Sequence, residues 1–153
     1  MAEISKYVLF KLRDQLFAVD VFQVISIERV HEITNVPRTS RFIKGVATIR
    51  DVTTPIIDLK ERLLMTETDI TENSRILVVN IKGMQIGLIV DAASTVLDIE
   101  YTTVEPAPKI IGGVEETYTK GIAKLDEGLL IILDLDSIIN EDESKELQKV
   151  SRE

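Results

Sequence analysis

The sequence predicts a mostly β protein, built from two similar five-stranded units that each close into a small barrel. Three observations lead to this prediction. The apolar runs are short, polar turns separate them, and one segment of the chain repeats another. Regular helix is expected in only two short places.

The repeat is the strongest of these observations. Residues 42–59 fall on residues 118–135 at an offset of 76 without a gap, and six of the 18 aligned positions are identical. The upstream halves share a layout at an offset of 69, for example Leu12 with Ile81. We expect the extra residues to lie in the first copy, in the loop around residues 31–41. A duplicated unit leaves a seam between its copies, where a partner or ligand is expected to bind.

The strands are short runs rich in Val, Ile, Leu and Phe, separated by turn residues such as Lys-Gly and Asp-Glu-Gly. This is the pattern of hairpins, and closing five such strands into a barrel removes exposed sheet edges. The expected strands are residues 7–12, 17–21, 24–30, 45–49, 53–58, 75–81, 85–90, 93–99, 121–125 and 129–133.

These strands divide five to a copy. We therefore expect a single domain over residues 1–153, in which residues 7–70 form one barrel and residues 71–140 form the other. A charged tail or short helix is expected over residues 141–153.

A second short helix is expected over residues 58–64. Asp58 is placed to cap it, and Glu61 follows three residues later as in a capping box. The segment 105–113 carries two prolines and two glycines, so we expect it to be a loop.

Composition excludes several classes of function. The chain has no cysteine and one histidine, His31, so disulfides, thiolate chemistry and paired imidazoles are excluded. A net charge of −8 argues against nucleic-acid binding, which needs clustered Lys and Arg. No apolar run approaches the roughly 20 residues that cross a bilayer, and the start of the chain lacks the apolar core of a signal peptide. We expect a soluble cytoplasmic protein.

Three chemical sites were considered. Asp58 and Asp134 occupy equivalent places of the repeat, as the two carboxylates of an aspartic protease do, but each is followed by Leu. A role in capping is therefore favoured. Gly112 and Gly113 lack the Gly-Lys-Ser/Thr of a phosphate loop, and His31 has no second imidazole with which to hold a metal. We expect no catalytic residues, no metal and no cofactor.

The remaining feature is apolar sequence near the seam. Val21, Val24 and Ile27 follow one another at spacings of three. Such positions are often simply core. In a chain without catalytic residues, an apolar groove rimmed by charge is otherwise a typical recognition site for another protein.

These residues carry a family resemblance. The segment FIKGVATIRDVTTPIIDLKERL resembles the signature of CheW-type chemotaxis coupling proteins, with its Lys-Gly-Val, its Asn-Leu-Arg-Gly turn and its Pro-Ile-Ile-Asp-Leu strand end. The flanking LFAVDVFQVISIERV, IGLIVDAASTVLDI and EPAP segments are also similar to that family. The resemblance covers about residues 6–140.

The resemblance implies two SH3-like five-stranded barrels and an adaptor without enzymatic activity. Such adaptors link methyl-accepting chemoreceptors to the regulatory domain of the CheA histidine kinase, in the cytoplasm at the membrane-associated receptor array. A CheV-type coupling module or another scaffold of the same fold with a different partner is the alternative. A ligand-binding or enzymatic barrel is the third class, and it would require a deep polar pocket.

The resemblance also implies positions for two binding sites. The receptor-binding positions are Val21, Val24, Ile27, Arg50, Val90 and Val96. The kinase-binding positions, at the ends of the barrels, are Val46, Ile49, Val52, Ile122 and Leu125.

One turn departs from the family signature. Thr48 and Asp51 stand where the signature has Asn and Gly, and a glycine there usually serves a positive φ. Asp tolerates this conformation better than most residues, so we expect the turn to be retained.

Overall fold

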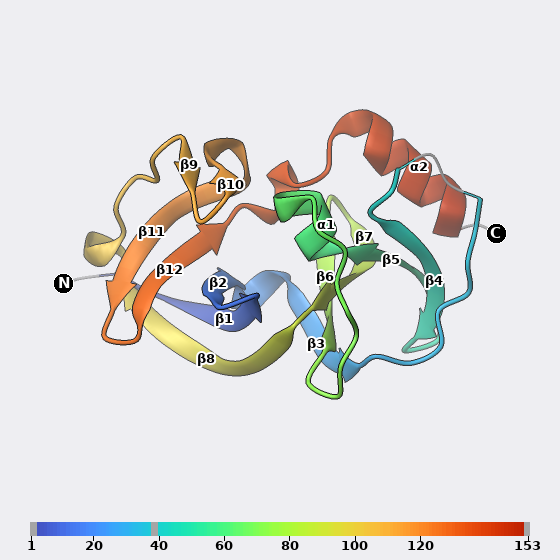
Figure 1. Ribbon diagram of the computed structural model, residues 1–153, viewed down its shortest axis with the longest axis horizontal. Helices are drawn as coiled ribbons and strands as arrows, with labels where there is room; N and C mark the ends of the chain where they lie inside the picture. Colours follow the sequence, from blue (N-terminus) through green and yellow to red (C-terminus); the bar gives the residue numbers. More distant parts are fainter. Residues whose placement is uncertain (1–2, 38–39, 152–153) are drawn as a thin grey trace.

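Ten of the strands in the described residues, 3–37 and 40–151 of this computed structural model, form two five-stranded mixed sheets, each with one parallel pair (Figure 1). Barrel 1 has the strand order β11 (Thr119–Leu125), β12 (Gly128–Leu133), β2 (Gln15–Asp20), β1 (Ile4–Leu12) and β8 (Ala92–Glu100). Barrel 2 has the order β4 (Ile43–Ile49), β5 (Val52–Asp58), β7 (Met84–Val90), β6 (Arg75–Ile81) and β3 (Val24–Arg29). The predicted mostly β fold is confirmed.

The two copies of the repeat exchange hairpins, so each barrel contains strands from both copies. Barrel 1 combines the β1–β2 hairpin of the first copy with β8, β11 and β12 of the second, and barrel 2 combines β6–β7 with β3, β4 and β5. In each barrel, the exchanged hairpin is joined to the other copy by one parallel pair of strands. Phe17 of β2 lies opposite Ile131 of β12, and Leu88 of β7 lies opposite Ile57 of β5. The expectation that residues 7–70 and 71–140 each fold on themselves is therefore wrong. The repeat survives as a pseudo-two-fold relation between the barrels.

Each barrel is closed by one additional bridge. Thr34, which follows β3, exchanges two backbone hydrogen bonds of 2.9 and 2.8 Å with Val46 of β4. Glu105, which follows β8, exchanges two of 2.8 Å with Ile122 of β11. The two bridges occupy equivalent places, so the edge strands of each barrel are joined in the same way.

Glycine is required beside both bridges. A Cβ atom on Gly45 would lie 2.0 Å from the carbonyl oxygen of Thr34, and one on Gly121 would lie 2.7 Å from that of Glu105. The Lys-Gly pair that the two copies share is thereby explained, because any side chain at these positions would push the closing strand away.

The linker between the halves of a copy is longer in the second copy, contrary to the expectation. It contains β9 (Ile110–Ile111) and β10 (Val114–Glu115), which form a small hairpin where loop was expected. An offset that grows from 69 to 76 along the chain in fact requires the extra residues to be in the second copy. Short 3₁₀ turns complete the chain: η1 (Val21–Gln23), η2 (Tyr101–Thr103), η3 (Glu116–Tyr118) and η4 (Leu135–Ser137).

Both expected helices are present. In α1 (Leu59–Leu64) the side chain of Asp58 caps the N-terminus by accepting a 3.2 Å hydrogen bond from the Glu61 N–H. The C-terminal helix α2 (Glu141–Ser151) buries Leu147 and Val150 and contacts β4 and β5 of barrel 2. Neither helix, nor any other helix in the described part of the chain, is long and apolar enough to cross a membrane.

One large core extends through both barrels. Phe10 and Phe17 of barrel 1 stack with their ring centroids 5.6 Å apart, and the same cluster includes Leu77 and Leu88 of barrel 2. Two smaller clusters each draw on the strands of a single barrel. The contact region between the barrels, which we call the seam, is therefore packed core on its inside.

Candidate partner-binding surface at the seam

Large apolar side chains are exposed on η1, β3 and β8. Phe22 is 93% exposed, Val96 54% and Ile27 42%, with Ile25 beside them in the chain. The turn η1 contacts both β1 and β6, and β8 contacts β6, so these elements adjoin across the two barrels. We call Phe22, Ile25, Ile27 and Val96 the seam surface; β3 and β8 carry it along the lower side of Figure 1.

The chain presents Phe22 through a capped turn. The Asp20 carboxylate accepts a 2.9 Å hydrogen bond from the Phe22 N–H, which starts the 3₁₀ turn, while Val21 and Val24 pack on the core. With its neighbours pointing inward, the aromatic ring points to solvent. Phe22 was not among the predicted receptor-binding positions, although an aromatic residue inside the VFQVISI run is a visible signal.

The spacing of three that selected Val21, Val24 and Ile27 does not describe one face. Burial alternates along β3, so Val24 is half-buried whereas Ile25 and Ile27 are exposed. Side chains of a strand alternate between its faces, and residues an odd number apart point to opposite sides. Of the three predicted residues, only Ile27 belongs to the exposed surface.

Tyr7 and Asp20 add a polar edge near η1. Burial and the negative charge of Asp20 raise the pKa of the Tyr7 hydroxyl, while a hydrogen bond with Ser5 opposes them. The neutral phenol is therefore retained to a higher pH than in an unfolded chain.

Several predicted contact residues are in the core. Val90 is fully buried, and Ile49 and Ile122 are also buried within the barrels. Buried side chains offer a partner little surface, so direct contact is better supplied by exposed neighbours of these three residues. Val52 is exposed on barrel 2, whereas Val46 and Leu125 are half-buried.

Arg50 and Asp51 form the tip of the β4–β5 hairpin. Their φ values of 54° and 65° confirm that the turn is retained with a positive φ at Asp51. The side-chain amide of Gln85 donates to the Ile49 carbonyl at 3.1 Å, and Asn80, opposite Gln85, accepts from Gln23 of η1 at 3.4 Å. The Arg50 turn thus lies at the same end of barrel 2 as η1.

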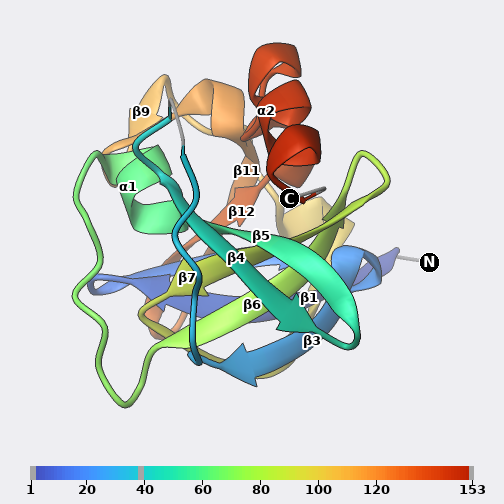
Figure 2. The same ribbon diagram turned by 90° about the vertical axis from the view of Figure 1, so that its right-hand side faces the viewer.

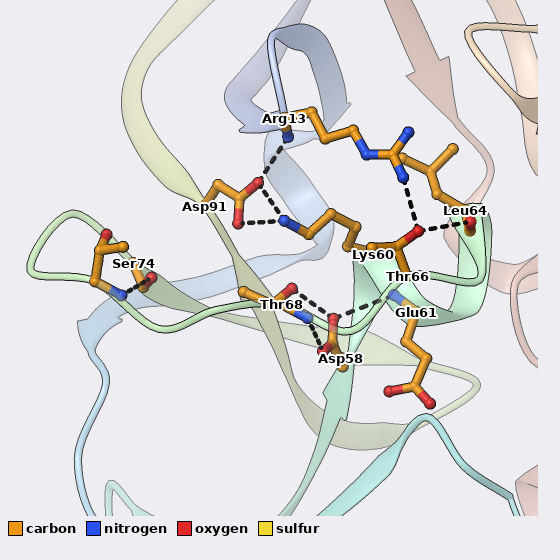
Figure 3. Close-up of polar contacts among 10 residues, drawn as sticks. Arg13, Asp58, Lys60, Glu61, Leu64, Thr66, Thr68, Ser74 and Asp91 are labelled. Atoms are coloured by element: carbon orange, nitrogen blue, oxygen red, sulfur yellow. Dashed lines mark hydrogen bonds and ion pairs between the residues drawn. The ribbon is translucent and has the colours of Figure 1, made fainter.

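A polar network crosses the seam on its other side (Figure 3). The Asp91 carboxylate accepts two hydrogen bonds from the Lys60 ammonium, of 2.9 and 3.1 Å, and one of 2.6 Å from the Arg13 N–H. The Arg13 guanidinium donates to the Thr66 hydroxyl at 2.7 Å. The β1–β2 turn of barrel 1 is thereby attached to α1 and to the end of β7.

The repeated aspartates have local roles. Asp58 is buried and accepts hydrogen bonds from the Thr68 N–H and hydroxyl, both 2.7 Å, besides capping α1 (Figure 3). Asp134 accepts one of 2.7 Å from the Ser137 hydroxyl. The capping prediction is confirmed for Asp58, whereas the Asp134 carboxylate bonds to the Ser137 hydroxyl and makes no side-chain cap at the start of η4.

Lys44 is held between two carboxylates. Its ammonium lies 2.6 Å from Glu61 and 3.3 Å from Glu67. Burial by itself lowers the pKa of Lys44, but the hydrogen bonds and charges of Glu61 and Glu67 outweigh it and raise the pKa above its ordinary value. Glu61 is therefore paired with Lys44 rather than completing a capping box, and the Asp58 N–H donates to Phe42 instead.

No group of three His, Asp or Glu side chains that could hold a metal is present within residues 3–37 and 40–151. His31 is exposed on the linker between β3 and β4. Gly112 and Gly113 form the turn of the β9–β10 hairpin.

Comparison with known proteins agrees with this architecture. The CheW-like domain model matches residues 6–143. The chemotaxis protein CheW of Bacillus subtilis is 32% identical over 92% of this chain and 90% of its own length, and that of Klebsiella aerogenes is 28% identical over 97% and 89%. The crystal structure of the scaffolding protein TtCheW from Thermoanaerobacter tengcongensis superposes with a TM-score of 0.81 at 34% identity, covering 92% of this chain and 90% of that one.

Proposed function

Because this chain belongs to the CheW-like family, we propose that it is a non-enzymatic chemotaxis adaptor that couples methyl-accepting receptors to the CheA histidine kinase. The observation that carries the proposal is the match over residues 6–143, supported by the fold shared with a scaffolding protein. The adaptor would act in the cytoplasm, at the membrane-associated receptor array.

The receptor tip would bind the seam surface. Exposed aromatic and aliphatic side chains in a contiguous group are typical of protein interfaces, and large ones such as Phe22 often dominate the binding energy. Ile27, Val96 and Arg50 remain in the proposed site, whereas Val21 and Val24 support it from the core side. The buried Val90 is removed from it.

The kinase regulatory domain would bind at the ends of the barrels. Val52 follows the β4–β5 turn and Leu125 precedes the β11–β12 turn, so both lie at equivalent hairpin ends of the two barrels, and Val46 lies on β4. Two equivalent ends would let one adaptor contact two partners. The buried Ile49 and Ile122 support these ends from within.

Two titrations test the proposal. The purified chain is titrated in a calorimeter with the CheA regulatory domain of its own organism and, separately, with a soluble receptor fragment. We expect saturable one-to-one binding to the kinase domain. Phe22→Asp is expected to weaken receptor binding by about tenfold or more and to leave kinase binding unchanged.

Ile70→Asp is the matched control, since Ile70 is an exposed aliphatic residue on the loop between α1 and β6, where it borders a hollow with Lys44 and Thr68. Receptor binding that tolerates Phe22→Asp would place the receptor site elsewhere. If neither the kinase domain nor the receptor binds, the proposed coupling role is wrong although the fold assignment is unaffected. The alternative is then a CheV-like module or another scaffold with a different partner.

A further inference from the structure

A cleft of about 400 Å³ lies on the face opposite the seam surface. It is bordered by α1, β10 and the residues before β4, which all lie on the upper side of the molecule, whereas β3 lies on the lower side (Figures 1 and 2). The lining includes Arg41, Phe42, Leu64, Met65, Glu115 and Tyr118. We call this the α1 cleft.

The floor of the α1 cleft is built around the paired guanidinium of Arg62. The Arg62 guanidinium lies over the rings of Phe42, at 4.8 Å, and Tyr118, at 5.4 Å, which are equivalent residues of the two copies. It also makes two hydrogen bonds of 2.7 and 2.8 Å to Glu143 and one of 2.7 Å to the Ile138 carbonyl. With all of these partners in place, Arg62 offers an incoming ligand a neutral, largely apolar floor.

Met65 stands at the edge of the cleft as an exposed apolar side chain. It is 90% exposed and has a φ of 59°, the left-handed conformation that ends α1. Glycine is the usual residue there, and a non-glycine residue in this conformation is strained. A flexible, polarisable methionine in such a position is well suited to fill a gap in another surface.

The two rims of the cleft carry opposite charges. Arg41, from the barrel 2 side, is 95% exposed, and its guanidinium lies 3.8 Å from the Glu61 carboxylate. Glu115, from β10 on the barrel 1 side, is also exposed. A two-fold rotation about an axis through the cleft brings Arg41 of one molecule toward Glu115 of the other.

We propose that the α1 cleft binds a second copy of this chain in an isologous dimer. Each Met65 enters the cleft of the other copy, and Arg41 pairs with Glu115 on both sides, so one patch supplies both knob and hole. The net charge of −8 on each copy opposes association, so the dimer is a weak one. Because the seam surface is on the opposite face, the dimer leaves it free for a partner.

Sedimentation equilibrium of the purified chain, without kinase or receptor, tests the dimer at concentrations up to about 1 mM. Met65→Gly removes the knob and suits the left-handed backbone, so we expect at least about tenfold weaker association together with an unchanged or higher Tm. Ile70→Ser, which removes an exposed aliphatic side chain elsewhere, should leave association unchanged.

Charge reversal tests the orientation. Arg41→Glu and Glu115→Arg should each weaken the dimer, and the double variant should restore it, because the pair is then re-formed with its signs exchanged. A chain that stays monomeric at the highest concentration, a dimer that tolerates Met65→Gly, or a double variant that is not restored would each overturn the proposal. None of these outcomes bears on binding to the kinase or the receptor.

Discussion

The barrels can close because Gly45 and Gly121 have no side chain to separate them from the closing strands. Gly45→Ala places a methyl group against the Thr34 carbonyl and also strains a backbone with a φ of +148°. We expect it to lower the free energy of unfolding by about 3 kcal/mol or more, measured by urea denaturation. Gly121→Ala should cost somewhat less, since its backbone lies outside the positive-φ region and its Cβ would lie 2.7 Å, rather than 2.0 Å, from the nearest carbonyl oxygen, with Val104 Cγ1 also at 2.7 Å.

Gly128→Ala is the control for these two variants. Its φ is +132°, but a Cβ atom there would meet open space, so only backbone strain applies and a loss of about 1 kcal/mol is expected. If Gly128→Ala were as damaging as Gly45→Ala, backbone conformation rather than close approach of the closing strand would explain the glycines.

Individual residues were predictable where the cause is local. The cap formed by Asp58 follows from its place before α1 and is confirmed, but its two bonds to Thr68 depend on a loop that the sequence does not position. The face of Val24 was mistaken because a helical spacing was applied to a strand. Burial of Val90 and Ile122 depends on how the barrels pack, which no local pattern contains.

At the scale of elements, the Glu143 side chain of α2 both caps its own helix and binds α1. Glu143 accepts from the Asn140 N–H at 2.9 Å while its own N–H donates to the Asn140 side chain at 2.8 Å, a reciprocal cap at the start of the helix. The same carboxylate binds Arg62 of α1 through two hydrogen bonds. Both side chains are largely buried, so the pair is worth more than a surface ion pair.

Glu143→Gln retains an acceptor for the cap but removes the charge that faces Arg62. We expect a loss of about 2 kcal/mol in the free energy of unfolding. Hydrogen exchange at the α2 amides should accelerate more than exchange in β6 and β7, because the helix opens locally. Lys6→Met, which breaks the exposed Lys6–Asp98 pair, should cost less than about 0.5 kcal/mol. Equal losses for the two variants would mean that the Arg62 pair does not hold α2.

Elements were easier to predict than their pairing. All ten expected strands are present within a few residues of the predicted bounds, since alternation and turn residues are local signals. The β9–β10 hairpin was missed because its strands have two residues each. The exchange of hairpins could not be predicted. The parallel strands β2 and β12 are far apart in the sequence, and their apolar side chains would suit neighbours within one copy equally well.

At the scale of the whole molecule, the exchange makes the two barrels depend on each other. Neither barrel can form from a contiguous half of the chain, because each contains a hairpin from the other copy. The core that contains Phe17 of barrel 1 and Leu88 of barrel 2 is also a single cluster. A molecule of this kind has no half that could remain folded while the other unfolds.

We therefore expect a single two-state thermal transition, in which the calorimetric and van't Hoff enthalpies agree. Phe17→Leu and Leu88→Ala alter different barrels, and Leu88→Ala should cost about 3 kcal/mol from the cavity that it leaves. Each variant should lower the one transition without splitting it. Differential scanning calorimetry decides the matter, since a second transition in either variant would show that the barrels unfold independently despite their exchanged strands.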